Sequence, residues 1–232
     1  MINHRSLNLT LLFLSALFLG SATAQEKQIK LRFLGFPQMQ NPEPVELLIG
    51  DNKTIEVNTP GNEFSAPYTV SSLTSIVVGK TVKNEKNEEV FQSYGSAKAL
   101  NAEDQIVLLL RKGEKASDGF LVLPLDGSQT NFKASSFLFF NASNFSIGGI
   151  IGDQKFGLKP GQSKMLKPKP NHEDGICQVT FYYMKGEKWK TVYDTRWPAN
   201  EKFRSIVFFY QDPTSGRLGI APIVDVLPYK KK

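Results

Sequence analysis

The feature that most constrains this chain is an internal repeat. The phrase "IGDNKTIEVNTPG" (residues 49–61) returns about a hundred residues later as "IGDQKFGLKPG" (residues 151–161). Further stretches match in the same order: residues 101–110 with 199–210, and residues 121–127 with 220–226. Landmarks that keep their order over a whole unit are typical of a duplication. The repeat therefore predicts two copies of one domain, at residues 25–130 and 131–232.

Within each predicted domain, apolar and polar residues alternate with the period of two that half-buried strands show. In residues 29–33, for example, Ile29, Leu31 and Phe33 share one face. The pattern predicts seven strands in the first domain: 29–33, 45–49, 54–57, 74–78, 90–94, 105–110 and 120–123. It predicts eight in the second: 137–140, 147–151, 155–158, 163–166, 178–183, 189–193, 205–210 and 218–226.

Short strands separated by turns every eight to twelve residues favour a sandwich over a barrel. Helix signals are almost absent. Residues 106–110 are apolar throughout, which predicts a central strand covered on both faces. The sequence therefore predicts an all-β protein with two tandem immunoglobulin-like antiparallel β-sandwiches. The junction at residues 126–133 is short and polar, so we expect the domains to meet with limited freedom.

The first 24 residues have the three parts of a secretory signal peptide. Arg5 gives a basic start, residues 7–19 are mostly apolar, and "ATA" precedes Gln25. Thirteen residues are well short of the roughly 20 that a membrane-spanning helix needs. We therefore expect cleavage after Ala24, secretion or delivery to a periplasm, and no transmembrane span in the mature chain.

Cysteine content and charge narrow the function classes. Cys177 is the only cysteine, so the chain cannot form an intramolecular disulfide and must depend on packing. The net charge is +6, or +5 without Arg5. Such a charge favours acidic partners such as anionic polysaccharides, lipid headgroups or nucleic acid. Because most lysines are spread along the chain, a solvated surface is the better explanation, and we expect no nucleic-acid partner.

One stretch carries a resemblance to known proteins. "FLFFNAS" (residues 137–143) is a strand that leads into an Asn-Ala-Ser turn, and "IGD…PG" follows it. In this, the chain resembles a loose group of secreted bacterial proteins with tandem β-sandwich units and no assigned activity. The resemblance implies an extracellular or periplasmic module without chemistry of its own. The group commonly has a proline after the serine, where this chain has Asn144.

Catalytic residues are scarce. His172, in a proline-rich loop, is the only histidine after the predicted cleavage. A hydrolase would need it near a nucleophile such as Ser163 or Cys177, and no Gly-x-Ser-x-Gly motif is present. A solvated loop explains His172 better, and burial as a small apolar residue explains Cys177 better. We therefore predict no catalytic residues.

Metal and cofactor sites are not indicated either. One histidine and one cysteine cannot supply a zinc site. Asp51 and Asp153 recur in the repeat, but each offers one carboxylate where a calcium loop needs several oxygens. Gly-Asp in a two-residue hairpin already explains both residues. No glycine-rich phosphate loop opens a helix. We predict no metal and no cofactor.

Aromatic residues concentrate in the second predicted domain, and they give the candidate site. In residues 188–197, Trp189, Tyr193 and Trp197 alternate with cations. Aromatic rings beside cations are typical of surfaces that bind sugars or single-stranded nucleic acids. Trp189 fits a sandwich core better, whereas Trp197, next to Pro198, could equally lie in a loop. We therefore place a candidate ligand site at Tyr193, Arg196 and Trp197.

Together these patterns predict an exported, non-catalytic binding or structural module whose partner is an envelope protein or a polysaccharide. One alternative is a carbohydrate-binding module that uses the aromatic residues of the second domain. A second is a hydrolase that uses His172. A third is a subunit of a surface assembly whose edge strands pair with neighbours.

Overall fold

The computed structural model describes residues 27–36, 43–51, 53–113, 115–170, 174–212 and 215–227. These residues form sixteen strands and one three-residue 3-10 helix, η1 (Ala116–Asp118). The first eight strands are β1 (Gln28–Phe36), β2 (Val45–Gly50), β3 (Lys53–Val57), β4 (Tyr68–Ser71), β5 (Ser75–Lys83), β6 (Glu89–Lys98), β7 (Asp104–Arg111) and β8 (Phe120–Asp126). The last eight are β9 (Phe137–Asn141), β10 (Ile147–Ile151), β11 (Gln154–Leu158), β12 (Ser163–Leu166), β13 (Ile176–Lys185), β14 (Lys188–Pro198), β15 (Phe203–Gln211) and β16 (Leu218–Val226). The prediction of an all-β protein is confirmed.

The strands form four sheets of four, and the last eight strands repeat the order of the first eight. The orders β4-β1-β7-β8 and β3-β2-β5-β6 return as β12-β9-β15-β16 and β11-β10-β13-β14. Most pairs are antiparallel, but β1 runs parallel to β7 and β9 runs parallel to β15. The parallel pairs are possible because the chain crosses to the other sheet before it returns. The predicted purely antiparallel arrangement is therefore corrected to a mixed one.

Each set of eight strands encloses its own apolar core. In the first set, Leu31, Phe33 and Val107 pack against Leu47 and Val78 of the facing sheet. In the second set, Phe139 and Val207 pack against Ile147, Val179 and Phe181. The second core is richer in aromatic residues: Phe139 stacks on Phe156 at 4.5 Å between ring centroids. Two facing sheets with a shared interior give each set a sandwich-like form.

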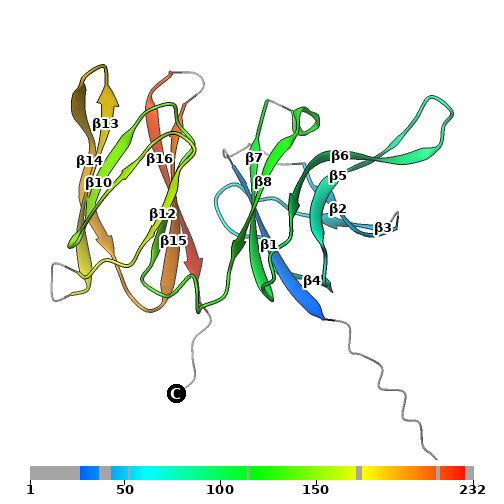
Figure 1. Ribbon diagram of the computed structural model, residues 1–232, viewed down its shortest axis with the longest axis horizontal. Helices are drawn as coiled ribbons and strands as arrows, with labels where there is room; N and C mark the ends of the chain where they lie inside the picture. Colours follow the sequence, from blue (N-terminus) through cyan, green and yellow to red (C-terminus); the bar gives the residue numbers. More distant parts are fainter. Residues whose placement is uncertain are drawn as a thin grey trace, which may run out of the picture.

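A third apolar core joins the two sets. The sheets β4-β1-β7-β8 and β12-β9-β15-β16, here called the inner sheets, pack against each other through the faces that point away from their own cores. Figure 1 shows the two sets side by side, with β15 and β16 toward β7 and β8. The strand registers make the contributions equivalent: Ile106 with Ile206, Leu108 with Phe208, Leu110 with Tyr210, and Leu125 with Ile223. The two sets thus meet through the same surface, as subunits do in a twofold dimer. We call this contact the seam.

Both edge strands β8 and β16 carry a proline at the same register position. Pro124 pairs with Val107, and Pro222 pairs with the equivalent Val207. Proline has no backbone N–H to give to a ladder, so it is tolerated at the edge of a sheet. The apolar "LVLPLDG" and "IAPIVDV" segments are therefore edge strands, not central ones.

The structure differs from the sequence-based expectation in two details. The first set has eight strands, not seven, because the four-residue edge strand β4 was missed. An immunoglobulin constant domain keeps its first two strands in one sheet, whereas β1 and β2 lie in different sheets, as do β9 and β10. The two-sheet plan is therefore present with a different strand order. All eight strands expected in residues 137–226 are found.

Candidate functional site

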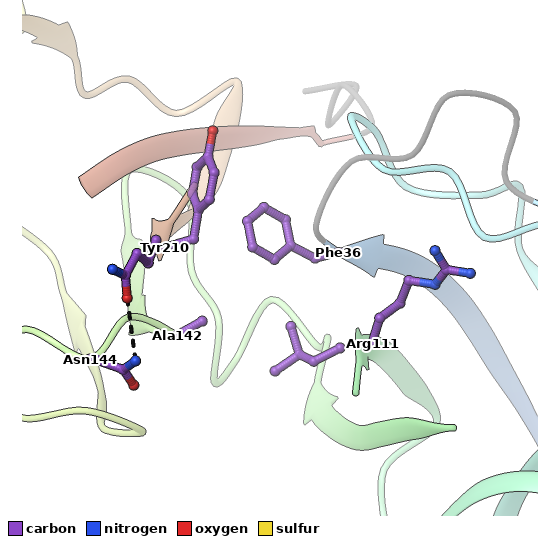
Figure 2. A pocket seen from close by; sticks show the side chains of 7 residues that line it. Phe36, Arg111, Ala142, Asn144 and Tyr210 are labelled. Atoms are coloured by element: carbon purple, nitrogen blue, oxygen red, sulfur yellow. Dashed lines mark hydrogen bonds between the residues drawn. The ribbon is translucent and has the colours of Figure 1, made fainter. Parts of the chain in front are cut away.

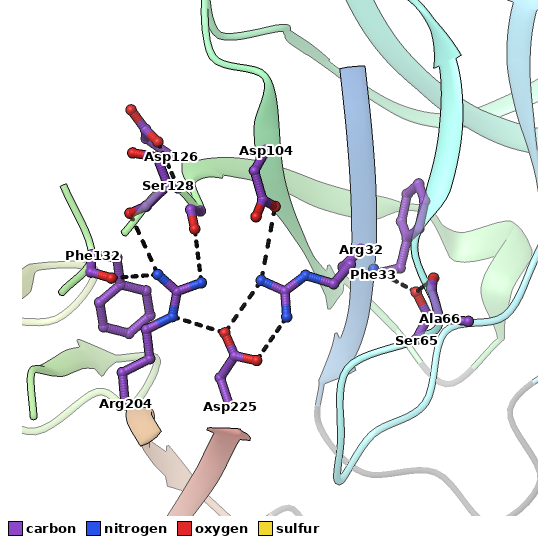
Figure 3. A network of polar contacts seen from close by, with 11 residues as sticks. Arg32, Phe33, Ser65, Ala66, Asp104, Asp126, Ser128, Phe132, Arg204 and Asp225 are labelled. Carbon is purple, nitrogen blue, oxygen red and sulfur yellow. Dashed lines mark hydrogen bonds and ion pairs between the residues drawn. The ribbon is translucent and has the colours of Figure 1, made fainter. Parts of the chain in front are cut away.

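One end of the seam is closed by a row of alternating charges, Asp104, Arg32, Asp225 and Arg204, which we call the ionic chain (Figure 3). Arg32 on β1 binds Asp225 on β16 with two hydrogen bonds of 2.7 and 3.2 Å. Arg204 on β15 donates to the same carboxylate at 2.8 Å. Bidentate arginine–carboxylate pairs fix geometry strongly. The ionic chain therefore ties the first strand set to the second.

Arg204 also holds the junction between the sets. Its side chain is 1% exposed and donates to the carbonyl oxygens of Gly127, at 2.8 Å, and Phe132. The guanidinium lies 4.4 Å from the centre of the Phe132 ring. Phe132 is itself buried in the seam. The junction is therefore anchored by specific contacts, which is more than a short polar linker predicts.

Asp104 ends the ionic chain at a hollow of about 230 Å³. Burial raises the pKa of its carboxyl, and the charges of Arg32 and Arg204 offset this only in part. Among the lining residues, Arg32 and Arg204 are hydrogen-bonded to Asp225, and Arg32 makes a longer ion pair of 3.8 Å with Asp104. We interpret this end of the seam as structural.

The opposite end of the seam contains a small hollow of about 160 Å³ with both polar and apolar lining (Figure 2). Phe36 on β1 meets Tyr210 on β15 edge to face at 5.3 Å, and it stacks on Phe208 at 4.3 Å. Two of the lining residues are bound to each other: Asn144 donates a hydrogen bond to Gln211 at 3.3 Å. Sites for small molecules usually enclose about 300–1,000 Å³. At about 160 Å³, this hollow is smaller than a typical small-molecule site.

The strongest candidate is the solvent-facing side of the sheet β11-β10-β13-β14, which we call the aromatic face: Gly148, Ile150, Lys155, Gly157, Gln178, Thr180, Tyr182, Met184, Trp189, Thr191, Asp194 and Arg196. Trp189 is 52% exposed, although tryptophan is usually well buried. Its indole reaches across β13 to β10, where Cζ3 lies 3.3 Å from the point a Gly148 Cβ would occupy. Gly148 thus leaves room for the ring to lie over the sheet.

The other end of the aromatic face is polar and pre-organised. Gln178 donates to Oδ1 of Asp194 at 2.7 Å, and the Thr180 hydroxyl donates to the same oxygen at 3.2 Å. Arg196 lies directly opposite Gln178 in the strand register. The face therefore combines an exposed aromatic ring with side chains that can bind hydroxyl or carboxylate groups.

The structure divides the three residues predicted to bind ligand between the two sides of this sheet. Trp197 pairs with buried Cys177 and stacks on Phe137 at 5.9 Å, so it faces the core. Tyr193 also faces inward, with its ring 5.9 Å from Trp197, and remains 36% exposed at the sheet edge. Arg196 faces outward. Tyr193 and Trp197 are brought together, and Arg196 is not.

Sequence reasoning placed Trp189 in the core, and this is wrong. Trp189, Tyr193 and Trp197 are spaced by four residues, so a regular strand would put all three on one side. A β-bulge shifts the register where Phe181 pairs with Tyr193 and Tyr182 pairs with Thr191. The bulge turns Trp189 to the other side.

Cys177 is buried, as predicted. It is 0% exposed, and burial, followed by the charge of Asp153, raises the pKa of its thiol. A reactive cysteine needs a lowered pKa, so this environment opposes thiol chemistry. His172 lies outside the described residues. Ser163 begins the edge strand β12 and is exposed.

The repeated Gly-Asp pairs take part in turns, with a difference between them. Gly152 has a φ of 54°, and Gly152-Asp153 links β10 to β11 as a two-residue turn. Asp153 accepts a hydrogen bond from the backbone N–H of Lys169, which ties the turn to the proline-rich loop. In the first set, β2 continues through Gly50, and Asp51 follows it. Asp51 is exposed.

Two wider searches of the described residues give no positive result. No group of three or more histidine, cysteine, aspartate or glutamate side chains in the described ranges is arranged to hold a metal ion. Within the same ranges, no helix is long and apolar enough to cross a membrane.

Comparison with known proteins identifies no relative. No protein-family model matches the chain, and no curated protein is significantly similar to it in sequence. The resemblance to secreted tandem β-sandwich proteins therefore rests on the stretch from residue 137 to 161.

Proposed function

We propose that this chain is an exported, non-catalytic binding module of the periplasm or cell surface, and that it contacts its ligand through the aromatic face. In this proposal residues 1–24 are a cleaved signal peptide, and two tandem sandwich domains, residues 25–130 and 131–232, form one rigid body. The single observation that carries the proposal is the half-exposed indole of Trp189, which lies over Gly148 on an open sheet.

Three features support binding over catalysis. The aromatic face is open, so a long or large ligand can reach it. Its polar side chains are held by hydrogen bonds between Gln178, Thr180 and Asp194, which lowers the entropy cost of ordering them on binding. Burial and the charge of Asp153 raise the pKa of the Cys177 thiol, which disfavours the thiolate that would act as a nucleophile.

A carbohydrate is the ligand class that the geometry favours. An exposed aromatic ring presents a flat apolar surface with a negative face. The C–H faces of sugar rings match such a surface, and their hydroxyl groups match nearby amide and carboxylate groups. On the same side of the sheet, Gln178 supplies an amide, Asp194 a carboxylate and Arg196 a guanidinium group.

The test compares the wild-type protein with Trp189→Ala and Phe91→Ala in capture of ligand from fractionated envelope extract. Phe91 occupies the position of Trp189 in the first strand set, so Phe91→Ala is the matched control. We expect the same retained species with wild type and Phe91→Ala, and its loss with Trp189→Ala at an unchanged melting temperature. Equal capture by Trp189→Ala would contradict the proposal.

A further inference from the structure

We infer that the aromatic face binds a segment of a linear acidic polysaccharide that lies along β13, with sugar rings stacked on Trp189 and carboxylate groups held by Arg196 and neighbouring lysines. This inference rests on the proposed function and names the ligand class of that site.

The length of the face fits an extended chain. The outward residues of β13 run from Met184 through Tyr182 and Thr180 to Gln178. Six steps at about 3.3 Å per residue give a track of roughly 20 Å. Trp189 lies at one end of the track, and Arg196 lies at the other. A ligand that uses both ends must therefore be several sugar rings long.

Beside the track, the sheet carries two glycines. Gly148 on β10 and Gly157 on β11 face each other, and Tyr182 of the track is next to Gly148. The Trp189 indole covers Gly148, whereas Gly157 is exposed. Because glycine has no side chain, the sheet surface next to the indole is open to close approach by a ligand ring.

Charge favours an acidic ligand over a neutral one. By the strand register, the cationic side chains on the described part of the face itself are Lys155 and Arg196, and the acidic one is Asp194. The adjoining hairpin adds Lys185, Lys188, Lys190 and the acidic Glu187, and its three lysines lie on the register positions that alternate away from Trp189. Asp194 already accepts hydrogen bonds from Gln178 and Thr180. A guanidinium can bind a uronic-acid carboxylate through two parallel hydrogen bonds.

The position of Trp189 favours a polysaccharide over a membrane surface. Lysines near an exposed tryptophan can also mark contact with anionic lipid. A membrane-contacting ring would have to project from the end of the hairpin, around Gly186. The indole of Trp189 instead turns back over the sheet to Gly148.

The experiment measures binding of the purified protein to five probes by titration calorimetry and tryptophan fluorescence. Two probes are acidic oligosaccharides, oligogalacturonate and hyaluronan fragments, tested beside neutral cello-oligosaccharides. Polyaspartate controls for charge without sugar rings, and vesicles with anionic lipid test the membrane alternative. We expect at least one acidic oligosaccharide to bind, to shift Trp189 emission, and to bind more weakly as salt is added.

Three variants separate stacking from charge. Trp189→Ala should weaken acidic-oligosaccharide binding about tenfold or more, in line with the effect of losing one stacked ring. Gly148→Val should lift the indole and weaken binding several-fold without unfolding, because valine suits a strand. Phe91→Ala, at the equivalent position of the first set, should leave binding unchanged.

Each other result has a defined meaning. Equal binding of neutral oligosaccharides overturns the acidic specificity. Polyaspartate binding that does not depend on Trp189, or preference for vesicles, overturns the polysaccharide. If envelope capture depends on Trp189 but acidic oligosaccharides neither bind nor compete, this inference fails and the proposed function stands. If capture does not depend on Trp189, the proposed function fails as well.

Discussion

The two outer sheets, β3-β2-β5-β6 and β11-β10-β13-β14, share one backbone plan and present opposite surfaces. Both carry a register shift at the same place, between Val78 and Gly79 on β5 and between Phe181 and Tyr182 on β13. The registers then equate four outward positions: Glu46 with Gly148, Gly79 with Tyr182, Thr81 with Met184, and Phe91 with Trp189. Differences between the two faces are therefore differences of side chain.

The position of one glycine decides what each face exposes. In the first set the glycine is Gly79 on β5, the strand next to the one that carries Phe91. A Cβ at Gly79 would be 2.8 Å from the Phe91 ring. Glu46 fills the neighbouring position and accepts a hydrogen bond from the Thr81 hydroxyl at 2.6 Å. In the second set the glycine is Gly148, and the larger Trp189 extends over it into solvent. A duplicated scaffold has thus produced one closed polar face and one open aromatic face.

The largest expected effect comes from equivalent seam positions that differ in charge. Asp104 and Arg204 occupy the same register position of β7 and β15. Arg204→Ala removes one of the two arginine donors to Asp225 and takes the side-chain donor from the buried carbonyls of Gly127 and Phe132, so we expect the free energy of unfolding to fall by about 3–5 kcal/mol. Urea denaturation measures this. Asp104→Asn, which removes a carboxyl whose pKa burial raises, should cause no loss at neutral pH. An Arg204→Ala loss no larger than that of Asp104→Asn would contradict this explanation.

The second effect separates the two tryptophans. Trp197→Ala removes a ring that stacks on Phe137 and meets Phe181 edge to face, so we expect a loss of about 2–3 kcal/mol. Trp189→Ala removes an exposed ring, and we expect a change below about 0.5 kcal/mol. Thermal and urea unfolding of the two variants check this order. A reversed order would place Trp189 in the core and remove the aromatic face.

The smallest effect tests the closed face of the first set. Burial acts to raise the pKa of Glu46, but hydrogen bonds from Thr81 and Thr54 outweigh it and lower the pKa below its usual value. A carboxyl with a lowered folded-state pKa adds stability above its unfolded value, near pH 4.3, and this contribution is lost as the pH falls through the folded value. Glu46→Gln should therefore lower the melting temperature slightly at pH 7 and match wild type near pH 3. Glu56→Gln, on the adjoining strand, controls for the loss of one charge. A difference that persists at pH 3 would contradict this explanation.

Much of the fold could be predicted from the sequence because its signals are local and repeated. Period-two alternation located the strands of residues 137–226, and the unbroken apolar run 106–110 indicated a strand covered on both faces. The short strand β4 has too few residues to show a period. That the cover for β7 would be the equivalent strand set could not be inferred, because alternation shows that a face is buried and not what buries it.

The candidate site was harder to predict than the fold, and one bulge explains why. The rule of alternation grouped Trp189 with Tyr193 and Trp197, and a single extra residue near Val192 breaks that grouping. Bulges carry no strong sequence signature in this segment, since Val192 is an ordinary strand residue. The aromatic clustering itself pointed to the correct strand, β14, and Arg196 lies on the correct side of it.

The seam has a consequence for how this protein can be divided. Dividing the chain at Gly127–Phe132 into separate fragments would expose an apolar sheet face to water on each fragment. It would also separate Arg204 from the carbonyl of Gly127. A protease that cuts the junction should therefore yield two fragments that remain associated, whereas either fragment produced alone should aggregate or form a homodimer.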